Sequence, residues 1–275
     1  MATKFVLLEL PLEFPDGTEK VLYIDGNNKI TAGNGKFGDP RPNAFSLIEI
    51  EDCPFSTRTC REVCYVGRLQ QAEPVVYQAY EHNSRVIREI LKRSDHQLYA
   101  EIILSKWIAE NCAGGFRWHV SGDIFPHQYA EFIQHVCQGT PEIPFWLYTR
   151  SFVFLDPLRE VRNLVINLSA DQDNYNLALA LHKIWGYRLC YLTVDGQVPP
   201  SLPRGSVIFP NHELRGRDLP PGERANTPFW QSLNYAQRSM ICKADYFGQK
   251  DRRRCDPNHC NICLVRPAHE IPDLL

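Results

Sequence analysis

The stretch NLVINLSADQDNYNLALALHKIWGYRLCYLTV, residues 163–194, decides the fold class of this chain. Its opening run, NLVINLS (163–169), is short and apolar, as a buried strand is, and NYNLALALHKIW (174–185) has the apolar spacing of a helix. The run YRLCYLTV (187–194) follows at once and predicts a second strand. A strand, a helix and a strand in this order form a βαβ unit, which places its two strands parallel in one sheet.

The same alternation runs through most of the chain. The other strands that we expect are AFSLIEIED (44–52), FRWHVS (116–121), FWLYT (145–149) and SVIFP (206–210). The other helices that we expect are 74–112, with a break near Ser94-Asp95, PHQYAEFIQHVC (126–137) and DPLREV (156–161). Short apolar strands of this kind are buried on both faces of a parallel sheet. We therefore predict an α/β fold, a partial (β/α)6 TIM-like barrel, over residues 43–241.

Two segments flank the predicted barrel. Residues 1–42 contain β-type runs and the turn-rich GNGKFGDPRP (33–42), so we expect an N-terminal β extension. Residues 242–275 carry four cysteines without evident secondary structure, so we expect a C-terminal cysteine-rich metal-binding segment. The part just before it, 213–241, is expected to be mostly loop.

Composition limits the classes of function. The chain has 275 residues, 44% of them hydrophobic and 23% charged, which is enough for a large domain with a core. Its net charge of −2 provides no general attraction to nucleic acid or to a membrane surface. The apolar opening is too short for a signal peptide, and no apolar run reaches the roughly 18 residues of a membrane helix. We expect a soluble cytoplasmic protein with no membrane partner.

Ten cysteines in such a chain point to metal or redox chemistry, because disulfides are disfavoured in a reducing compartment. The single cysteines Cys112, Cys137 and Cys190 lie in apolar contexts and are expected to be small buried hydrophobic residues. The other seven form two groups, Cys53, Cys60 and Cys64 in CPFSTRTCREVCY (53–65), and Cys242, Cys255, Cys260 and Cys263 in the tail.

The two groups predict different sites. Four tail thiolates make a closed ligand set for a structural zinc or a [4Fe-4S] cluster. Only Cys260 and Cys263 form a CxxC pair, whereas a zinc ribbon normally has two, so the spacing favours the cluster and zinc is the alternative. Three thiolates in the first group leave one position for water, a histidine or a substrate.

Polar residues follow the predicted strands, as SGD (121–123), TRS (149–151), SADQD (169–173), DG (195–196) and NHE (211–213). In barrels and open α/β sheets the ligand site lies at this carboxyl edge. The sequence therefore predicts one site at the strand ends, with the first cysteine loop among its walls.

Each candidate site residue could have a structural role instead of a role in ligand binding. Asp123, after the permissive Gly122, is either a ligand acceptor or a helix N-cap. Strand alternation places His119 on the same face as Arg117 and Ser121, so His119 is either in the cavity or a core histidine.

Later strand ends and the tail offer further candidates. Tyr148 and Arg150 leave one strand together, and Arg150 either holds a carboxylate or phosphate or forms a structural ion pair. Asn211 and His212 are weaker candidates for substrate contact. The basic run KDRRRC (250–255) is either a solvated loop or a phosphate contact if the substrate is nucleic acid.

A strand, a loop with three cysteines and a helix at the start of a (β/α) series resemble the radical S-adenosylmethionine (radical SAM) superfamily. There, three cysteines hold a [4Fe-4S] cluster and SAM occupies the fourth position. The common spacing is CxxxCxxC, whereas here it is Cys53-x6-Cys60-x3-Cys64 with Tyr65 after the third cysteine. The segments C…C…CY, RWHVSGD, FWLYTRS and the four-cysteine tail also resemble a family of phage and bacterial proteins named only after a phage gene product.

The radical SAM resemblance, over about residues 43–212, implies roles for particular residues. SAM would be held by Ser121, Gly122, Asp123, Asn167, Ser169, Asp171 and Tyr65, and catalysis would involve His119, Tyr148 and Arg150. The tail would hold an auxiliary [4Fe-4S] cluster. The substrate would be a small or nucleic-acid-derived molecule, and an electron donor such as a flavodoxin or ferredoxin is implied.

Two other classes of function remain open. One is a zinc-stabilised protein that binds a nucleotide or nucleic acid without turnover. The other is an iron–sulfur protein that only transfers electrons. Iron and acid-labile sulfide content and SAM binding separate these alternatives from the enzyme.

Overall fold

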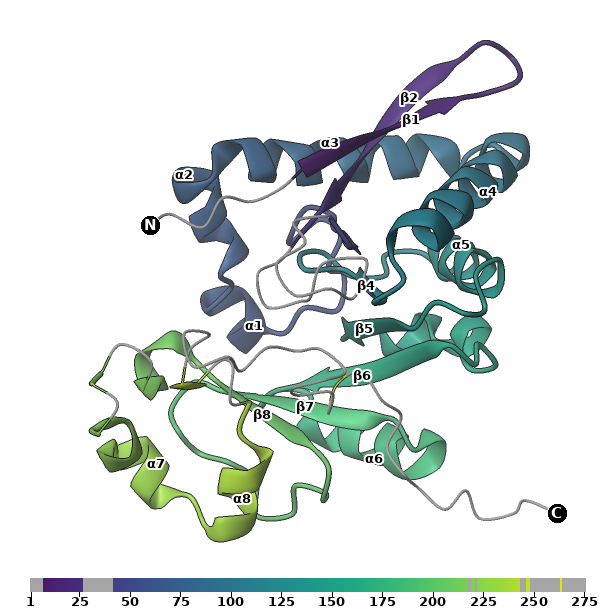
Figure 1. Cartoon of the computed structure of the whole chain (residues 1–275). Helices are drawn as coiled ribbons and strands as arrows, with labels where there is room; N and C mark the ends of the chain where they lie inside the picture. Colours follow the sequence, from purple (N-terminus) through teal and green to yellow (C-terminus); the bar gives the residue numbers. More distant parts are fainter. Residues whose placement is uncertain are drawn as a thin grey trace, which may run out of the picture. The chain divides into compact units, whose positions relative to one another are not determined.

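The computed structural model describes residues 7–26, 42–216, 219–220, 222–242, 246–247 and 263. The chain divides into two compact units. The first unit comprises residues 1–56 and 64–165, and the second comprises 57–63 and 166–275, within these described ranges. Both units are drawn in Figure 1.

The strands of the first unit pair in chain order (Figure 1). They are β1 (Leu7–Glu13), β2 (Glu19–Asp25), β3 (Ala44–Phe45), β4 (Phe116–Trp118) and β5 (Phe145–Thr149). The first two form an antiparallel hairpin, and β2 pairs antiparallel with β3. From β3 through β4 to β5 the pairing is parallel, as the sequence predicts.

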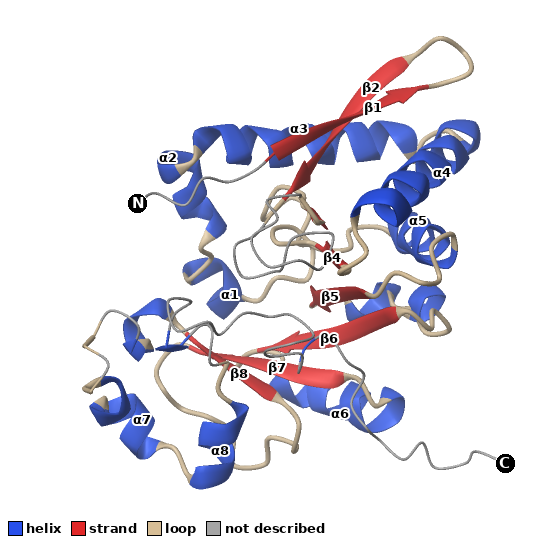
Figure 2. Ribbon diagram, viewed as in Figure 1, coloured by secondary structure: helices blue, strands red, loops and turns tan. Residues whose placement is uncertain are grey.

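Helices cover this sheet (Figure 2). They are η1 (Val66–Arg68), α2 (Leu69–Ala72), α3 (Pro74–Ile90), α4 (Ser94–Asn111) and α5 (His127–Gln138), with the 3-10 turns η2 (Phe152–Phe154) and η3 (Asp156–Leu158). The long predicted helix over 74–112 is confirmed as two helices, and the second begins at Ser94, as predicted. Figure 2 shows α3 running along the β1–β2 hairpin.

An aromatic core lies between the parallel strands and α5. The Trp118 ring stacks on Phe145 with a centroid distance of 6.4 Å, and its edge meets Phe45 and Phe116. Phe132 of α5 packs against Trp118 from the helix side. These rings are fully buried, and burial of several large aromatic side chains is the main stabilising term for such a layer.

Two predicted strands are shorter than expected. The stretch 44–52 was expected to be a strand, but β3 ends at Phe45 because side chains of α3 take over its backbone hydrogen bonds. Asn83 Nδ2 donates to the Ser46 carbonyl (3.0 Å), and the Ile48 amide donates to Ser84 Oγ (2.8 Å). Likewise β4 ends at Trp118 rather than residue 121, because His119 has a left-handed backbone with φ of 60°.

Three further strands are parallel, β6 (Leu164–Ala170), β7 (Arg188–Thr193) and β8 (Val207–Pro210), and they belong to the second unit from Ile166 of β6 onward. Its helices are α1 (Arg58–Glu62), α6 (Tyr175–Trp185), α7 (Pro228–Ser232) and α8 (Tyr235–Met240), with η4 (His212–Leu214) and η6 (Arg224–Asn226). The βαβ unit predicted from 163–194 is therefore confirmed as β6–α6–β7. The region 213–241, expected to be mostly loop, contains the short helices α7 and α8.

The observed architecture is a mixed α/β fold, which confirms the predicted class at that level. Nearly every residue of β5, β6 and β7 is buried, as expected of parallel strands covered on both faces. The turn 33–42 lies outside the described residues except for Pro42. The same is true of most of the segment 242–275.

A buried carboxyl group closes the end of β2. Asp25 is 1% exposed, and its Oδ2 accepts hydrogen bonds from Tyr80 OH (2.9 Å) and Ser46 Oγ (3.1 Å). Within the described residues, Oδ1 has no hydrogen-bond partner. Burial raises the pKa of Asp25 to about 7, although the two hydroxyl groups act in the opposite direction.

This pKa predicts a pH-dependent stability. Between about pH 4 and 7 the folded state retains a proton that the unfolded state has lost, so the free energy of unfolding should fall as pH rises through this window. At about 1.4 kcal/mol per pKa unit the fall is at most about 4 kcal/mol. In D25N both hydroxyl donors keep an acceptor but the titration is removed. Urea unfolding at pH 5 and pH 8 should therefore show a smaller difference in D25N than in the wild type, and equal differences would contradict this origin.

Candidate functional site

Asp123 is the centre of the polar cluster that follows β4 and β5. Its Oδ1 accepts hydrogen bonds from Thr149 Oγ1 (2.6 Å) and the Ile124 amide (2.7 Å), and its Oδ2 accepts from the Arg150 amide (2.8 Å). A carboxylate has about four acceptor positions, so one remains. Burial raises the pKa of Asp123, whereas these hydrogen bonds and the Arg150 charge lower it. Asp123 therefore fixes the end of β5 and has limited capacity for a ligand.

Gly122 and Ser121 form a close contact with the stretch after β3. Gly122 has φ of +80°, and a Cβ added there would lie 2.6 Å from Leu47 Cβ. The Ser121 carbonyl accepts a hydrogen bond from the Leu47 amide (3.0 Å). The Ser121 hydroxyl is buried and has no hydrogen-bond partner among the described residues. Glycine at 122 thus serves backbone packing, while Ser121 retains a hydroxyl available to a ligand or a water.

His119 lies in the protein interior. Its Nε2 is 2.9 Å from Tyr129 OH, and its Nδ1 has no hydrogen-bond partner in the described part of the chain. Burial, assisted by the positive charge of Arg117, lowers the pKa of His119 to about 3. His119 is therefore neutral at physiological pH and suits hydrogen bonding rather than acid catalysis.

The other strand-end candidates of the first unit lie close by. The Arg117 guanidinium is 5.1 Å from the centre of the Tyr148 ring, and its Nε donates to the His119 carbonyl (3.0 Å). Tyr148 and Arg150 are both partly exposed, whereas Thr149 between them is buried. Residues 117–123 and 148–150 thus form one strand-end cluster, as the sequence predicts for the carboxyl edge of β4 and β5.

The cysteine loop is attached to this cluster at both of its ends. Asp52, which precedes Cys53, has a buried side chain paired with Arg88, and its carbonyl accepts from the Asp123 amide (2.7 Å). Burial raises the pKa of Asp52, and Arg88 opposes the shift. Tyr65, which follows Cys64, donates its hydroxyl hydrogen to the carbonyl of Val120. Cys53 and Cys64 are both partly exposed.

Cys60 belongs to α1 in the second unit, where a threonine fixes the start of the helix. Thr57 Oγ1 accepts from the Cys60 amide (3.0 Å) and donates to Asp171 Oδ2 (2.5 Å). The Thr59 amide donates to Asp173 Oδ2 (2.9 Å). Asp171 and Asp173 follow β6, so the part of the loop that carries Cys60 is anchored to the carboxyl end of that strand.

Thr57→Val should loosen this part of the loop. Valine has the same shape but neither accepts from the Cys60 amide nor donates to Asp171, so we expect a loss of about 1–2 kcal/mol of stability. Thr57→Ser retains the hydroxyl and should stay within about 0.5 kcal/mol of the wild type. Urea unfolding of both variants measures the difference. An equal loss in both would show that the methyl group, rather than the hydrogen bonds, stabilises the loop.

The three β6 candidates do not share one environment. Asp171 contacts the Cys60 loop, as described above. Asn167, in the middle of the strand, donates through Nδ2 to the Cys263 carbonyl (3.2 Å) and accepts from Arg188 Nη1 (3.4 Å). Ser169 is directly opposite Cys190 in the β6–β7 pairing. Asn167 thus lies against the cysteine tail rather than beside Asp171.

Cys190 has a neighbourhood that its sequence context does not indicate. It is buried, as predicted, and the thiols of Cys263 and Cys242 both contribute to its electrostatic environment. Burial, followed by the contact with Cys263, raises the pKa of the Cys190 thiol, and the Arg188 cation opposes this shift. Across the described ranges no three cysteine, histidine, aspartate or glutamate side chains are gathered as a metal-binding group.

The remaining predicted residues lie elsewhere. Asn211 follows β8 and caps η4, since its Oδ1 accepts from the amide of His212 (2.7 Å) and also contacts its ring. Cys255, Cys260 and the run 250–255 lie outside the described residues.

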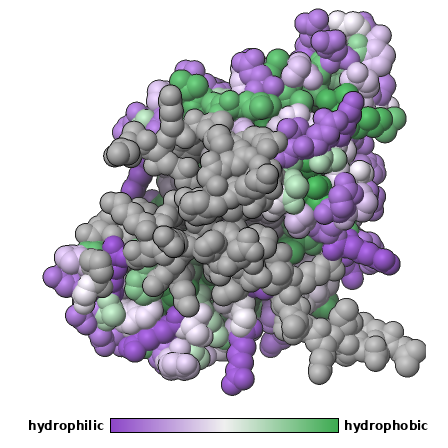
Figure 3. Space-filling model, viewed as in Figure 1, coloured by the Kyte–Doolittle hydropathy of each residue, from purple (hydrophilic) through white to green (hydrophobic). Residues whose placement is uncertain are grey.

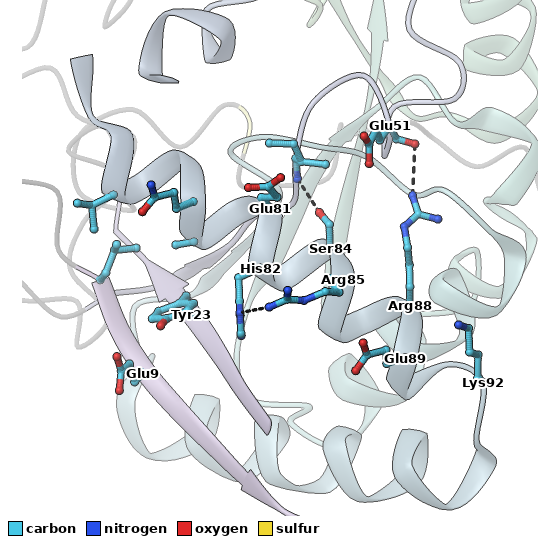
Figure 4. A pocket seen from close by; sticks show the side chains of 15 residues that line it. Glu9, Tyr23, Glu51, Glu81, His82, Ser84, Arg85, Arg88, Glu89 and Lys92 are labelled. Carbon is cyan, nitrogen blue, oxygen red and sulfur yellow. Dashed lines mark hydrogen bonds between the residues drawn. The ribbon is translucent and has the colours of Figure 1, made fainter. Parts of the chain in front are cut away.

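A groove of about 890 Å³ lies between the β1–β2 hairpin and α3 of the first unit (Figure 4). Its lining mixes acidic Glu9, Glu81 and Glu89 with basic Arg85 and Arg88, and none of the predicted site residues is part of it. Figure 3 shows hydrophobic and hydrophilic residues close together in this part of the surface. Because acidic and basic side chains are present in similar number, the groove does not favour a ligand of either charge. The strand-end cluster is therefore the better candidate for the functional site.

Fold and site together define a mixed α/β protein with parallel strands. The residues that flank the cysteine loop are bonded after β4 within the first unit, and the part with Cys60 is bonded after β6 within the second. The model of the family "Gene product 88" matches residues 20–265, so the chain belongs to this family. The Gene 88 protein of Mycobacterium phage L5 is 28% identical over 201 residues, which are 70% of this chain and 77% of that protein. The Gene 88 protein of Mycobacterium phage D29 is 27% identical over 214 residues, 74% and 82% of the two chains.

No solved structure matches the chain significantly. Among the helices in the described ranges, none is long and apolar enough to cross a membrane.

Proposed function

We propose that this protein is a cytoplasmic iron–sulfur enzyme of the radical SAM type, built on a partial (β/α)6 barrel over residues 43–241. In this proposal the first [4Fe-4S] cluster is held by Cys53, Cys60 and Cys64, and an auxiliary one by Cys242, Cys255, Cys260 and Cys263. Three thiolates with an open fourth position suit a cluster that also binds a small molecule. The substrate is a small or nucleic-acid-derived molecule, and a flavodoxin or ferredoxin supplies the electron.

The anchoring of the cysteine loop is the observation that carries the proposal. Before Cys53, the Asp52 carbonyl binds the Asp123 amide, and after Cys64 the Tyr65 hydroxyl binds the Val120 carbonyl. Around Cys60, Thr57 binds Asp171. These partners follow β4 and β6, and the carboxyl ends of parallel strands are where α/β proteins bind their ligands.

A bound cluster and SAM would supply the electron transfer and the radical that abstracts a substrate hydrogen. The chain's own residues would bind and orient. Asp123 has one acceptor position left for the SAM amino group, and the Ser121 hydroxyl lacks a partner among the described residues. Arg150 suits a carboxylate, since a guanidinium pairs with two oxygens at once. Neutral His119 would supply a hydrogen bond without adding charge.

Protein purified without oxygen tests the proposal. We expect about eight iron and eight sulfide per chain, and production of 5′-deoxyadenosine when SAM is added to the reduced protein. Clusters without SAM cleavage would instead support an electron-transfer protein. Zinc without sulfide, even after anaerobic reconstitution with iron and sulfide, would overturn the enzyme and support a zinc-stabilised binding protein.

A further inference from the structure

The strand β1 forms an open edge of the sheet in the first unit. It pairs with β2 on one side, and it is the terminal strand of the sheet. A strand in this position presents amide and carbonyl groups to which a strand of another chain can be added. The residues of β1 that point these groups outward decide which partner strand fits.

The hydrogen bonds of the hairpin identify the outward residues. The Phe14 amide donates to the Thr18 carbonyl (2.8 Å), so the hydrogen-bonded pairs of this antiparallel ladder involve the even-numbered residues. The odd-numbered residues of β2 bond away from β1, since both backbone groups of Tyr23 bond with the Asn83 side chain of α3 (2.8 Å each). The residues of β1 that direct their backbone groups to the open edge are therefore Leu7, Glu9, Pro11 and Glu13.

Across the described ranges none of these outward backbone groups takes part in a hydrogen bond. Pro11 fits this position, because an outward residue of an edge strand needs no amide hydrogen. Glu9 and Glu13 are exposed at the same edge. Proline and charged side chains discourage unwanted strand pairing, so a strand that pairs here must fit these residues in a particular register.

One antiparallel register fits β1 to a second copy of itself. When Leu10 is opposite Leu10 of the second copy, all 7 residues of the strand are paired. Leu7 is then opposite Glu13, and each outward amide meets an outward carbonyl. Glu9 is opposite Pro11 and therefore faces no like charge. A shift by two residues in either direction places Glu9 opposite Glu9 or Glu13 of the second copy, where like charges repel.

The same register continues the apolar face of the strand. Leu8, Leu10 and Leu12 share one face of β1, and Leu8 is half-buried whereas the other two are buried. In the paired strands Leu8 is opposite Leu12 of the second copy, so one row of leucines crosses both copies. Side chains directly opposite each other are about 4.5–5.5 Å apart, so pairing covers the part of Leu8 that is exposed in one copy alone. The glutamates remain on the other face.

We propose that β1 is a dimerisation strand, which pairs antiparallel with β1 of a second copy of this chain in the register centred on Leu10. The open hydrogen-bonding edge, the row of leucines and the separation of the glutamates all favour this register. The resulting dimer has two-fold symmetry, the commonest symmetry of homodimers. An interface of one strand from each copy is small, so we expect a dissociation constant in the micromolar range. This pairing involves β1 alone and does not depend on the proposed function.

Glu9→Pro in the full-length chain tests this pairing. The amide hydrogen of residue 9 points away from β2, so its loss leaves the hairpin intact but removes one intermolecular hydrogen bond from each copy. Sedimentation velocity should show a concentration-dependent dimer for the wild type and a dissociation constant at least about 10-fold higher for Glu9→Pro. Glu9→Thr is the matched control, because it keeps the amide and removes the charge, so it should dimerise at least as tightly as the wild type.

Hydrogen exchange of the wild type locates the interface without any variant, and circular dichroism checks that both variants are folded. The amides of Glu9 and Glu13 should become protected as the protein concentration rises, whereas those of Leu10 and Leu12 are protected throughout. A wild type that remains monomeric at about 500 μM would overturn the inference, as would a dimer that leaves the two glutamate amides unprotected. Equal weakening by Glu9→Pro and Glu9→Thr would assign the effect to the carboxylate and would also contradict strand pairing.

Discussion

Cys60→Ala is expected to abolish SAM cleavage and to remove about four iron and four sulfide per chain, while the protein remains folded. On the proposed function Cys60 supplies one of three thiolates to the first cluster, which leaves one of the four iron positions for SAM. Alanine is a strong helix former, and the Thr57 cap uses the backbone amide of residue 60, so α1 should persist. The loss should therefore concern the cofactor rather than the fold.

Iron and sulfide analysis, 5′-deoxyadenosine production and circular dichroism measure the three parts of this expectation. Cys112→Ala is the matched control, since Cys112 is a fully buried thiol at the end of α4 whose sulfur contacts the Pro42 carbonyl. It should lose some stability but no iron. Full SAM cleavage by Cys60→Ala would show that Cys60 is not a ligand of a catalytic cluster.

Asp123→Ala should destabilise the first unit strongly, by about 3–4 kcal/mol. The carboxylate accepts from Thr149, Ile124 and Arg150, and alanine leaves all three donors in a buried place without an acceptor. Urea unfolding measures the loss. Thr149→Val is the matched control, because it leaves the carboxylate and removes only one of its three donors. It also loses the hydrogen bond that Thr149 Oγ1 accepts from the Ser151 amide (2.9 Å), so it should cost about 1–2 kcal/mol.

The variant Asp123→Asn distinguishes two roles of Asp123, stabilising the fold and binding SAM. The amide oxygen can replace Oδ1, but the NH₂ group then faces the Arg150 amide, so some stability is lost. If Asp123 also binds the SAM amino group, Asp123→Asn should raise the dissociation constant for SAM well above that of a Thr149→Val variant. Equal SAM binding by the two variants would assign Asp123 to the fold alone.

Much of the fold was predictable from periodicity. The strand FWLYT coincides with β5, and the strand–helix–strand pattern over 163–194 is observed as β6, α6 and β7. These elements were predictable because a buried parallel strand is a short apolar run and its helix repeats every 3.6 residues. The cluster of polar groups after β4 and β5 followed from the same rule, since parallel strands end at one edge.

One cause of the misses is hydrogen bonding by side chains distant in sequence. The end of β3 depends on Asn83 and Ser84 of α3, and nothing in AFSLIEIED itself indicates this. The left-handed backbone of His119 was not predictable from FRWHVS either, because positive φ is uncommon for any residue other than glycine and no turn residue marks this position. Local sequence does not indicate that Cys190 is influenced by Cys263. Thr57, by contrast, could have been predicted as the N-cap residue of a short helix.

The dependence of residues 46–48 on α3 has a consequence for the order of folding. Asn83 links the Tyr23 backbone of β2 to the Ser46 carbonyl, so this link requires the helix and the hairpin to be in contact. Helices α3 and α4 are local structures that form quickly, whereas the segment leading to Cys53 acquires its shape only after they dock. On the proposed function, cofactor insertion would then follow collapse of the first unit instead of nucleating it, and a chaperone that delivers a cluster would meet a nearly native acceptor.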